Sequence, residues 1–175
     1  MKSALAAEPI LAAGLVQPSP PPVIAPLVSP PLPPEEAVGL DLILEGFLLH
    51  HGRPRQLAVS DAGRRVLAGD YCYAQGLVRM AASGDLVVIE ELADLIALGA
   101  AAVADGRREA LGPLWAGTIA AIRGRRAGED PDDLALRLSA AKRALRVDGD
   151  PRPLAELTGA LPHVEVFAEV FSREP

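Results

Sequence analysis

Apolar residues recur every three or four positions along most of the chain after residue 35, which is the period of an α-helix. The alternation that is typical of a β-hairpin is missing, and nothing repeats at a fixed longer period. The pattern predicts helices over residues 35–50, 61–82, 86–104, 107–122, 130–147, 154–159 and 163–171. We therefore expect an all-helical domain from about residue 35 onward.

Glycine and proline mark the expected helix ends. Gly52-Arg53-Pro54 ends the first helix, Ser83-Gly84 ends the second, and Gly106 follows the third. Gly112-Pro113 is expected to kink or split the fourth helix. Asp130-Pro131-Asp132-Asp133 is expected to cap the fifth, and we prefer this role over metal binding.

Two helices have a recognisable pattern of apolar positions. In the second helix the 3–4 spacing is followed by Val66, Leu67, Asp70, Tyr71, Ala74, Leu77, Val78 and Ala81. In the third, the stripe expected to form the core consists of Leu86, Ile89, Leu92, Ala93, Ile96 and Ala100. Asp70 is a carboxylate in an apolar helix, so we expect a structural partner, an arginine or a backbone group, in preference to a catalytic role.

Proline dominates the first 34 residues, with ten prolines between Pro9 and Pro34. Such density forbids regular helix and sheet, so residues 1–34 are interpreted as a disordered arm before a helical domain of residues 35–175. Pro18-Ser19-Pro20-Pro21 also has the spacing of ligands for the aromatic grooves of recognition domains. An unstructured arm is the main expectation, and a ligand motif is the alternative.

Composition narrows the possible classes of protein. Half of the residues are hydrophobic but only 3% are aromatic, which favours helix packing over pleated sheet. The net charge of −6 argues against nucleic-acid or anionic-membrane partners. No segment reaches the roughly 20 apolar residues of a membrane span, and no secretory leader is recognisable. The single cysteine, Cys72, excludes a disulfide framework and is expected to be packed and inert, so we expect a cytoplasmic protein.

One stretch has a more specific pattern. Gly52-Arg53-Pro54 is followed by Val66-Leu67-Ala68-Gly69-Asp70-Tyr71-Cys72-Tyr73-Ala74, and then by Gly84-Asp85, Leu92-Ala93-Asp94 and Ala104-Asp105-Gly106. This order resembles the trans-polyprenyl diphosphate synthases, over residues 40–107. The resemblance implies a truncated isoprenoid-synthase-like bundle over residues 35–107, with additional helices over 108–175. It also implies that Gly69, Asp70 and Tyr71 form a structural signature.

The parts of the family pattern that this sequence lacks are those that carry the chemistry. In the family, an Asp-Asp-X-X-Asp cluster binds Mg²⁺, because several carboxylates on one helix face share metals with a diphosphate. Counted back from Gly52-Arg53-Pro54, its acidic positions fall on Asp41, Leu42 and Glu45. His50-His51 stands where the family has an arginine pair. Imidazoles lack the permanent charge of the guanidinium group and its forked arrangement of hydrogen-bond donors. A second aspartate-rich helix and the early Gly-Gly-Lys phrase have no counterpart, and the chain is about half as long.

The resemblance therefore implies no catalytic residue and no enzyme activity by the chain alone. The leading hypothesis is a non-catalytic small or regulatory subunit that pairs, through its helices, with a catalytic polyprenyl synthase or with itself. The alternative is a stand-alone helical interaction module without an isoprenoid role. A weaker alternative is a vestigial prenyl diphosphate site of Asp41, Glu45 and Arg53, with Mg²⁺ as its cofactor; otherwise we expect no cofactor. A metal site of Asp41, Glu45 and the two histidines is less favoured than a solvated helix end.

Overall fold

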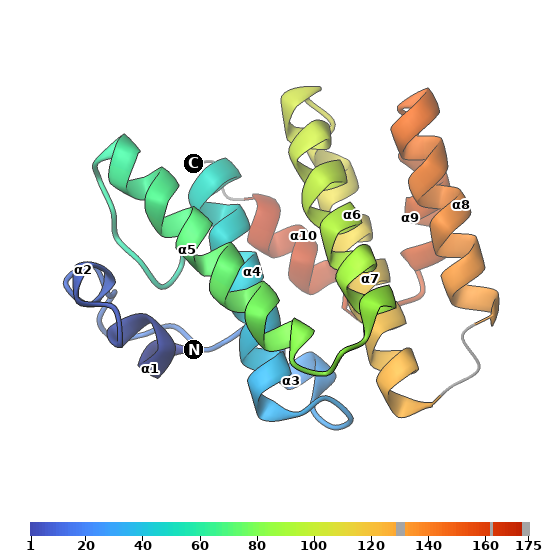
Figure 1. The fold of residues 1–175 in the computed structure, drawn as a ribbon. Helices are drawn as coiled ribbons and strands as arrows, with labels where there is room; N and C mark the ends of the chain where they lie inside the picture. Colours follow the sequence, from blue (N-terminus) through green and yellow to red (C-terminus); the bar gives the residue numbers. More distant parts are fainter. Residues whose placement is uncertain (129–131, 162, 173–175) are drawn as a thin grey trace. The chain divides into compact units, whose positions relative to one another are not determined.

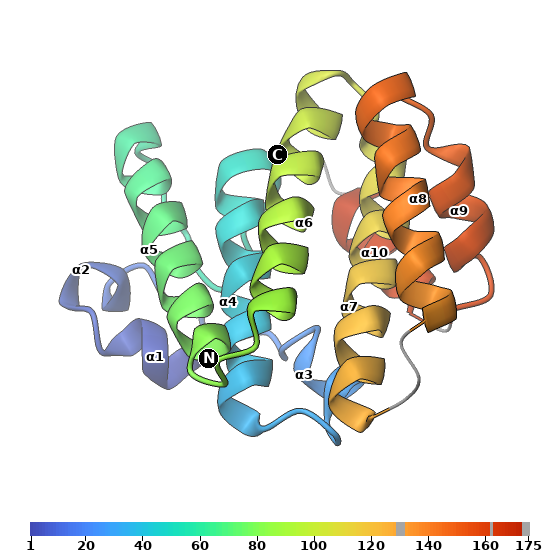
Figure 2. The same ribbon diagram turned by 45° about the vertical axis from the view of Figure 1, so that its right-hand side comes forward.

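The computed structural model describes residues 1–128, 132–161 and 163–172 and confirms the expected all-helical class (Figures 1 and 2). Within these residues the only strand-like feature is an isolated antiparallel bridge between Leu15 and Leu57. The chain forms two compact units, residues 1–85 and 86–172. This division differs from the expected boundary at residue 34.

The first unit is built on two long helices, α4 (Pro34–His51) and α5 (Ala62–Ala81), which run antiparallel and side by side (Figure 1). Helix α4 is buried along most of its length, since every residue from 36 to 49 except Val38 is buried. Small residues let the two backbones approach closely. A Cβ atom on Gly76 would lie 2.6 Å from the carbonyl oxygen of Gly39, and one on Gly46 would lie 3.0 Å from that of Gly69.

The buried face of α5 is not the one marked by its large apolar residues. The buried residues are Ala68, Gly69, Cys72, Gly76 and Met80. Among the side chains that follow the expected spacing, Leu67 is 69% exposed and Val78 is 64% exposed, whereas Tyr71 and Leu77 are half-buried. Close helix packing selects small side chains for the contact, and this leaves the larger ones on the outer face.

The proline-rich segment is folded against this pair of helices, so a disordered arm is not confirmed. Three short helices, α1 (Lys2–Ala6), α2 (Pro9–Ala12) and α3 (Ala25–Val28), lie within it. Six apolar residues of the segment are buried: Leu5, Leu11, Val23, Ile24, Val28 and Leu32. Proline prevents long helices but not burial, and the apolar area that these side chains remove from water offsets the entropy of ordering the segment.

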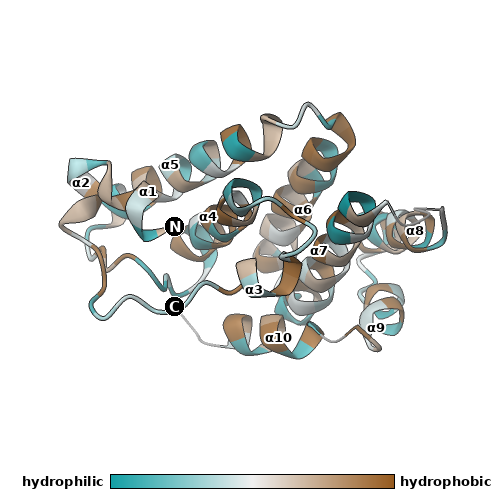
Figure 3. Cartoon of the chain, turned by 90° about the horizontal axis from the view of Figure 1, so that it is seen from below, coloured by the Kyte–Doolittle hydropathy of each residue, from teal (hydrophilic) through white to brown (hydrophobic). Residues whose placement is uncertain are grey.

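The second unit contains α6 (Leu86–Ala104), a 3₁₀ turn (Arg108–Ala110), α7 (Leu111–Ala127), α8 (Asp132–Asp148), α9 (Arg152–Thr158) and α10 (Val164–Ser172) (Figure 2). Helix α7 contacts each of the other helices of this unit. Its Trp115 is fully buried, with ring centroids 6.0 Å from Phe167 and 5.9 Å from Phe171 of α10. In Figure 3 the turns of α10 are largely hydrophobic in colour, which agrees with its role in this core.

The helix ends of the second unit show how local chemistry sets the boundaries. Gly106 has φ +75°, and its N–H donates to Val103 O while Arg107 N–H donates to Ala102 O, which is the Schellman arrangement. The expected helix over 107–122 is divided into the 3₁₀ turn and α7, which begins at Leu111, so Pro113 falls in the first turn of α7, where its missing N–H costs no helical hydrogen bond. The expected cap at Asp130-Pro131 lies outside the described residues.

The expected core stripe of α6 is only partly correct. The buried residues are Val88, Leu92, Leu95, Leu98, Gly99 and Ala102, whereas Leu86 is 79% exposed. This helix is apolar around most of its circumference, so periodicity alone does not define which face is buried. Two ion pairs connect α6 with α8: Lys142 with Glu91, and Arg146 Nη2 with Asp94 Oδ1 at 2.7 Å.

Candidate functional site

Asp41 lies in the middle of α4 and is 3% exposed. Its Oδ1 accepts hydrogen bonds from the backbone N–H groups of Val23 at 2.9 Å and Ile24 at 2.8 Å, and its Oδ2 accepts one from Ala25 at 3.0 Å. These amides are at the start of α3, where no earlier carbonyl of the helix is available to them. Asp41 therefore attaches the proline-rich segment to α4.

Glu45 lies one turn later and is 2% exposed, and it attaches the loop between α4 and α5 to α4. Its carboxylate accepts from the backbone N–H groups of Arg55 at 3.0 Å, Gln56 at 2.7 Å and Leu57 at 3.0 Å. Gln56 extends the network, since its Nε2 donates to Pro20 O at 2.9 Å and its Oε1 accepts from Ser19 Oγ at 2.7 Å. The two carboxylates thus hold two separate segments on α4.

Burial raises the pKa of both carboxyl groups above their ordinary values, and the donating amides act in the opposite direction. Each carboxylate already accepts from three backbone amides, which leaves few lone pairs for a metal ion. Arg53, the third residue of the expected diphosphate site, is exposed and lies outside this network. Asp41 and Glu45 thus both lie on α4, and the carboxylate of each is occupied by hydrogen bonds from backbone N–H groups. Their role in binding diphosphate stays a prediction.

Arg65 has a structural role in this unit that no sequence pattern indicates. Its Nε donates to Leu49 O at 2.6 Å, and its Nη2 donates to Gly52 O and, at 3.4 Å, to Leu48 O. These carbonyls are at the C-terminal end of α4, where a cation is favourable to the helix dipole. The position of Arg65 in the next helix gives no local signal of this, because the contact spans 16 residues.

The signature residues Gly69, Asp70 and Tyr71 form part of the contact between α4 and α5. A Cβ atom on Gly69 would lie 2.5 Å from His50 Nε2, so a larger residue there would require the imidazole to move. Asp70 is not buried as expected: its side chain is 63% exposed, and its Oδ1 lies 3.1 Å from His50 Nε2. Tyr71 packs against the apolar cluster formed by α1, α2, α4 and α5.

His50 therefore has neighbours on two sides. Asp70 approaches its Nε2, and the ring of Tyr73 stacks on it with a centroid distance of 5.3 Å and an interplanar angle of 7°. The expected partner of Asp70, an arginine or a backbone group, is replaced by this histidine. The arrangement orients the imidazole and ties the end of α4 to α5.

Cys72 is fully buried in the same cluster, which confirms the expectation of a packed cysteine. Burial, together with the charge of Glu45, raises the pKa of its thiol to about 12. The thiolate is therefore scarce at neutral pH, and the nucleophilic chemistry of cysteine is suppressed.

Within the described part of the chain, no group of three or more histidine, cysteine, aspartate or glutamate side chains is placed to hold a metal ion. Among the described residues, no helix is long and apolar enough to cross a membrane. Comparisons of this chain with family models, curated proteins and solved structures found no match to any of them.

Proposed function

We propose that this chain is a non-catalytic helical protein that acts by binding another protein, and that the partner is a catalytic polyprenyl synthase. The choice of partner comes from the resemblance of residues 40–107, centred on Gly69-Asp70-Tyr71. The outer face of α5, the helix that carries this signature, is the proposed contact. We call Val66, Leu67, Ala74 and Val78 the outer α5 face.

The composition of this face is the observation that carries the proposal. Val66 is 49% exposed, Leu67 is 69% exposed and Val78 is 64% exposed, and Ala74 is exposed between them. They lie along one side of a 20-residue helix. Exposed apolar side chains along one side of a helix favour an interaction site, because a partner removes them from water.

The hydrogen bonds of Asp41 and Glu45 support the non-catalytic part of the proposal. Metal-assisted departure of a diphosphate needs carboxylates with lone pairs that are accessible to Mg²⁺. Here both are buried and accept backbone amides. If the chain did retain a vestigial site, calorimetry with Mg²⁺ and a prenyl diphosphate would give heat; we expect none.

The test is co-expression with a full-length polyprenyl synthase of the same genome. We expect the synthase to co-purify with this chain and its product length to change when the chain is added. The double variant Leu67→Asp, Val78→Asp is expected to abolish both effects, because the charges would be buried in the contact.

The matched control is Leu136→Asp on α8, which changes an equally exposed leucine, 68% in the structure, outside the outer α5 face. This variant should bind as the wild type does. Failure to co-purify, with product length unchanged, contradicts the choice of partner. Binding of an unrelated protein that the double variant abolishes would instead support a stand-alone interaction module.

A further inference from the structure

Residues 18–22 cross the surface of the first unit as a proline-rich strip that is fixed on both sides. Before it, Val16 N–H donates to Gln56 O at 2.9 Å. After it, Val23 and Ile24 donate to the carboxylate of Asp41. Residues 19–22 lie in neither helix nor turn. The strip is therefore a segment outside helix and turn whose two ends are held by the protein.

The strip has an outward and an inward side. Pro18, Pro21 and Pro22 are exposed, whereas Ser19 and Pro20 are half-buried and Val23 is buried. On the inward side the carbonyl of Pro20 accepts from Gln56 Nε2 at 2.9 Å. The outward residues Pro18 and Pro21 are three positions apart, which is the spacing of residues that share a face of a polyproline II helix.

A positive charge stands at one end of this face. Lys2 Nζ lies 3.4 Å from Oε1 of Gln17, the residue just before Pro18, and both side chains are exposed. Two outward prolines with a flanking cation fit a groove that is lined by aromatic rings and bordered by carboxylates.

We propose that the Pro18–Pro21 strip is a ligand for such a groove, in a proline-recognising domain of the SH3 class with acidic residues beside its aromatic rings. The inference is independent of the proposed function, since it uses another surface and another kind of partner. Because both ends of the strip are already held by the protein, binding costs less conformational entropy than it does for a free peptide.

The chain itself provides a control with the same proline spacing. Pro30 and Pro33 are also three apart and exposed, but residues 29–31 form a turn in which Leu32 N–H donates to Val28 O. That segment does not present its prolines on one extended face. Its substitution should leave the binding unchanged.

The experiment is a titration of isotope-labelled SH3 domains, chosen for acidic residues beside the groove, with the full chain. We expect saturable shifts of NMR signals that are confined to the aromatic groove. Pro18→Ala with Pro21→Ala should weaken the affinity at least about tenfold, as expected for the loss of the main contacts. Lys2→Glu should also weaken the affinity, and by a larger factor at low salt than at high salt. Thermal melts would verify that each variant is folded.

Three outcomes would overturn the proposal. The first is that no domain of the set shows saturable shifts. The second is that the chain with Pro18→Ala and Pro21→Ala binds with the same affinity as the wild type. The third is that Pro30→Ala with Pro33→Ala lowers the affinity as much as Pro18→Ala with Pro21→Ala does. The last would show that general proline content, and not this strip, determines binding.

Discussion

Asp41 and Glu45 show how the same residue type serves two different chemistries. In the sequence, an acidic pair at i and i+4 on a helix resembles what is left of a metal site. In the structure, each carboxylate accepts from three backbone N–H groups that have no carbonyl partner within a helix or sheet. An unpaired buried amide costs stability comparable to a lost hydrogen bond, so these side chains are structural acceptors.

Asp41→Asn tests this role at the level of one atom. The amide NH₂ of asparagine would take the place of one carboxylate oxygen and face a backbone N–H, so that two donors meet. We expect the free energy of unfolding to fall by about 1–3 kcal/mol in urea titrations. The control is Asp94→Asn, which removes one charge of a half-exposed ion pair in the second unit. It should change the free energy of unfolding by less than about 1 kcal/mol. Equal stability of Asp41→Asn and wild type would argue against the structural role.

A second prediction at the residue scale concerns pH. Since burial raises the folded-state pKa of Glu45 above its ordinary value of 4.5, its contribution to stability is full below that pH and is lost as the pH rises through the raised pKa. Relative to Glu45→Gln, which does not titrate, the wild type should lose stability as the pH rises above 4.5. Unfolding by urea at a series of pH values measures this difference. An opposite slope would mean that the amide donors outweigh the cost of burial.

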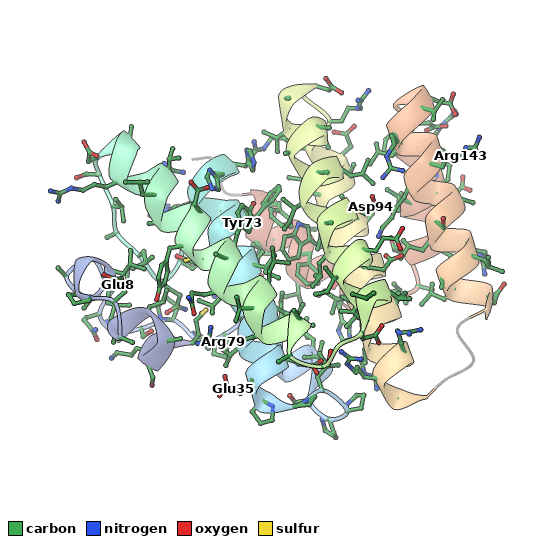
Figure 4. All side chains as sticks on the ribbon, viewed as in Figure 1. Glu8, Glu35, Tyr73, Arg79, Asp94 and Arg143 are labelled. Atoms are coloured by element: carbon green, nitrogen blue, oxygen red, sulfur yellow. The ribbon has the colours of Figure 1, made fainter. Side chains whose placement is uncertain are left out.

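At the scale of elements, the pair of α4 and α5 is determined by glycine. Gly39 and Gly46 on one helix face Gly76 and Gly69 on the other, and the two positions on each helix are seven residues, or two turns, apart. At the same end of the pair as the Gly39 contact, Arg79 Nε lies 3.4 Å from Glu35 Oε2, and Figure 4 shows these two side chains close together. The glycines allow the contact, and the ion pair is an exposed addition to it.

Gly76→Ala should therefore destabilise the first unit. The new Cβ would lie 2.6 Å from Gly39 O and from Ile43 Cγ1, so the helices must separate. We expect a loss of about 1–3 kcal/mol in thermal or urea unfolding, as for other overpacked cores. Gly63→Ala, in the first turn of the same helix, has its nearest contact at 3.5 Å and should stabilise the protein slightly. Similar effects of both substitutions would contradict the proposed close contact.

Helix positions were predictable, but helix faces were not. The expected helix over 86–104 coincides with α6, and the helix expected over 61–82 differs from α5 by one residue at each end. Caps and breakers act locally, so they can be recognised in a short window. The inward face of α5 was predicted from large residues such as Leu67, yet Gly69 and Gly76 make the contact. Periodicity detects hydrophobicity and does not detect how closely two backbones approach.

At the scale of the whole molecule, each unit has a core of its own. In the first unit it is the cluster of Leu5, Leu11, Leu42, Leu49, Leu57, Ala68 and Cys72. In the second it surrounds Trp115, the only tryptophan of the chain. The tryptophan therefore reports on the second unit alone, while far-ultraviolet circular dichroism reports on the helices of both.

This separation predicts two distinguishable unfolding transitions. Gly76→Ala should lower the midpoint of the transition seen by circular dichroism and leave the midpoint seen by Trp115 fluorescence unchanged, because its contacts lie in the first unit. Gly117→Ala, whose Cβ would lie 2.8 Å from Leu138 Cδ1 in the second unit, should lower the midpoint seen by Trp115 fluorescence together with the part of the circular dichroism transition that belongs to the second unit. If Gly76→Ala shifts both signals equally, the chain unfolds as a single cooperative unit.

By itself, the sequence determined the helical class, the positions of the long helices and the burial of Cys72. These depend on local propensity, on breakers and on the hydrophobicity of single residues. Only the tertiary structure decided that the proline-rich segment packs, that Asp41 and Glu45 bind backbone amides, and that α5 buries its small residues and exposes Leu67 and Val78. Each of these depends on groups that are distant in sequence, such as Asp41 and Ile24 or Gly39 and Gly76. Their pairing is a consequence of how closely the segments approach, which no local pattern encodes.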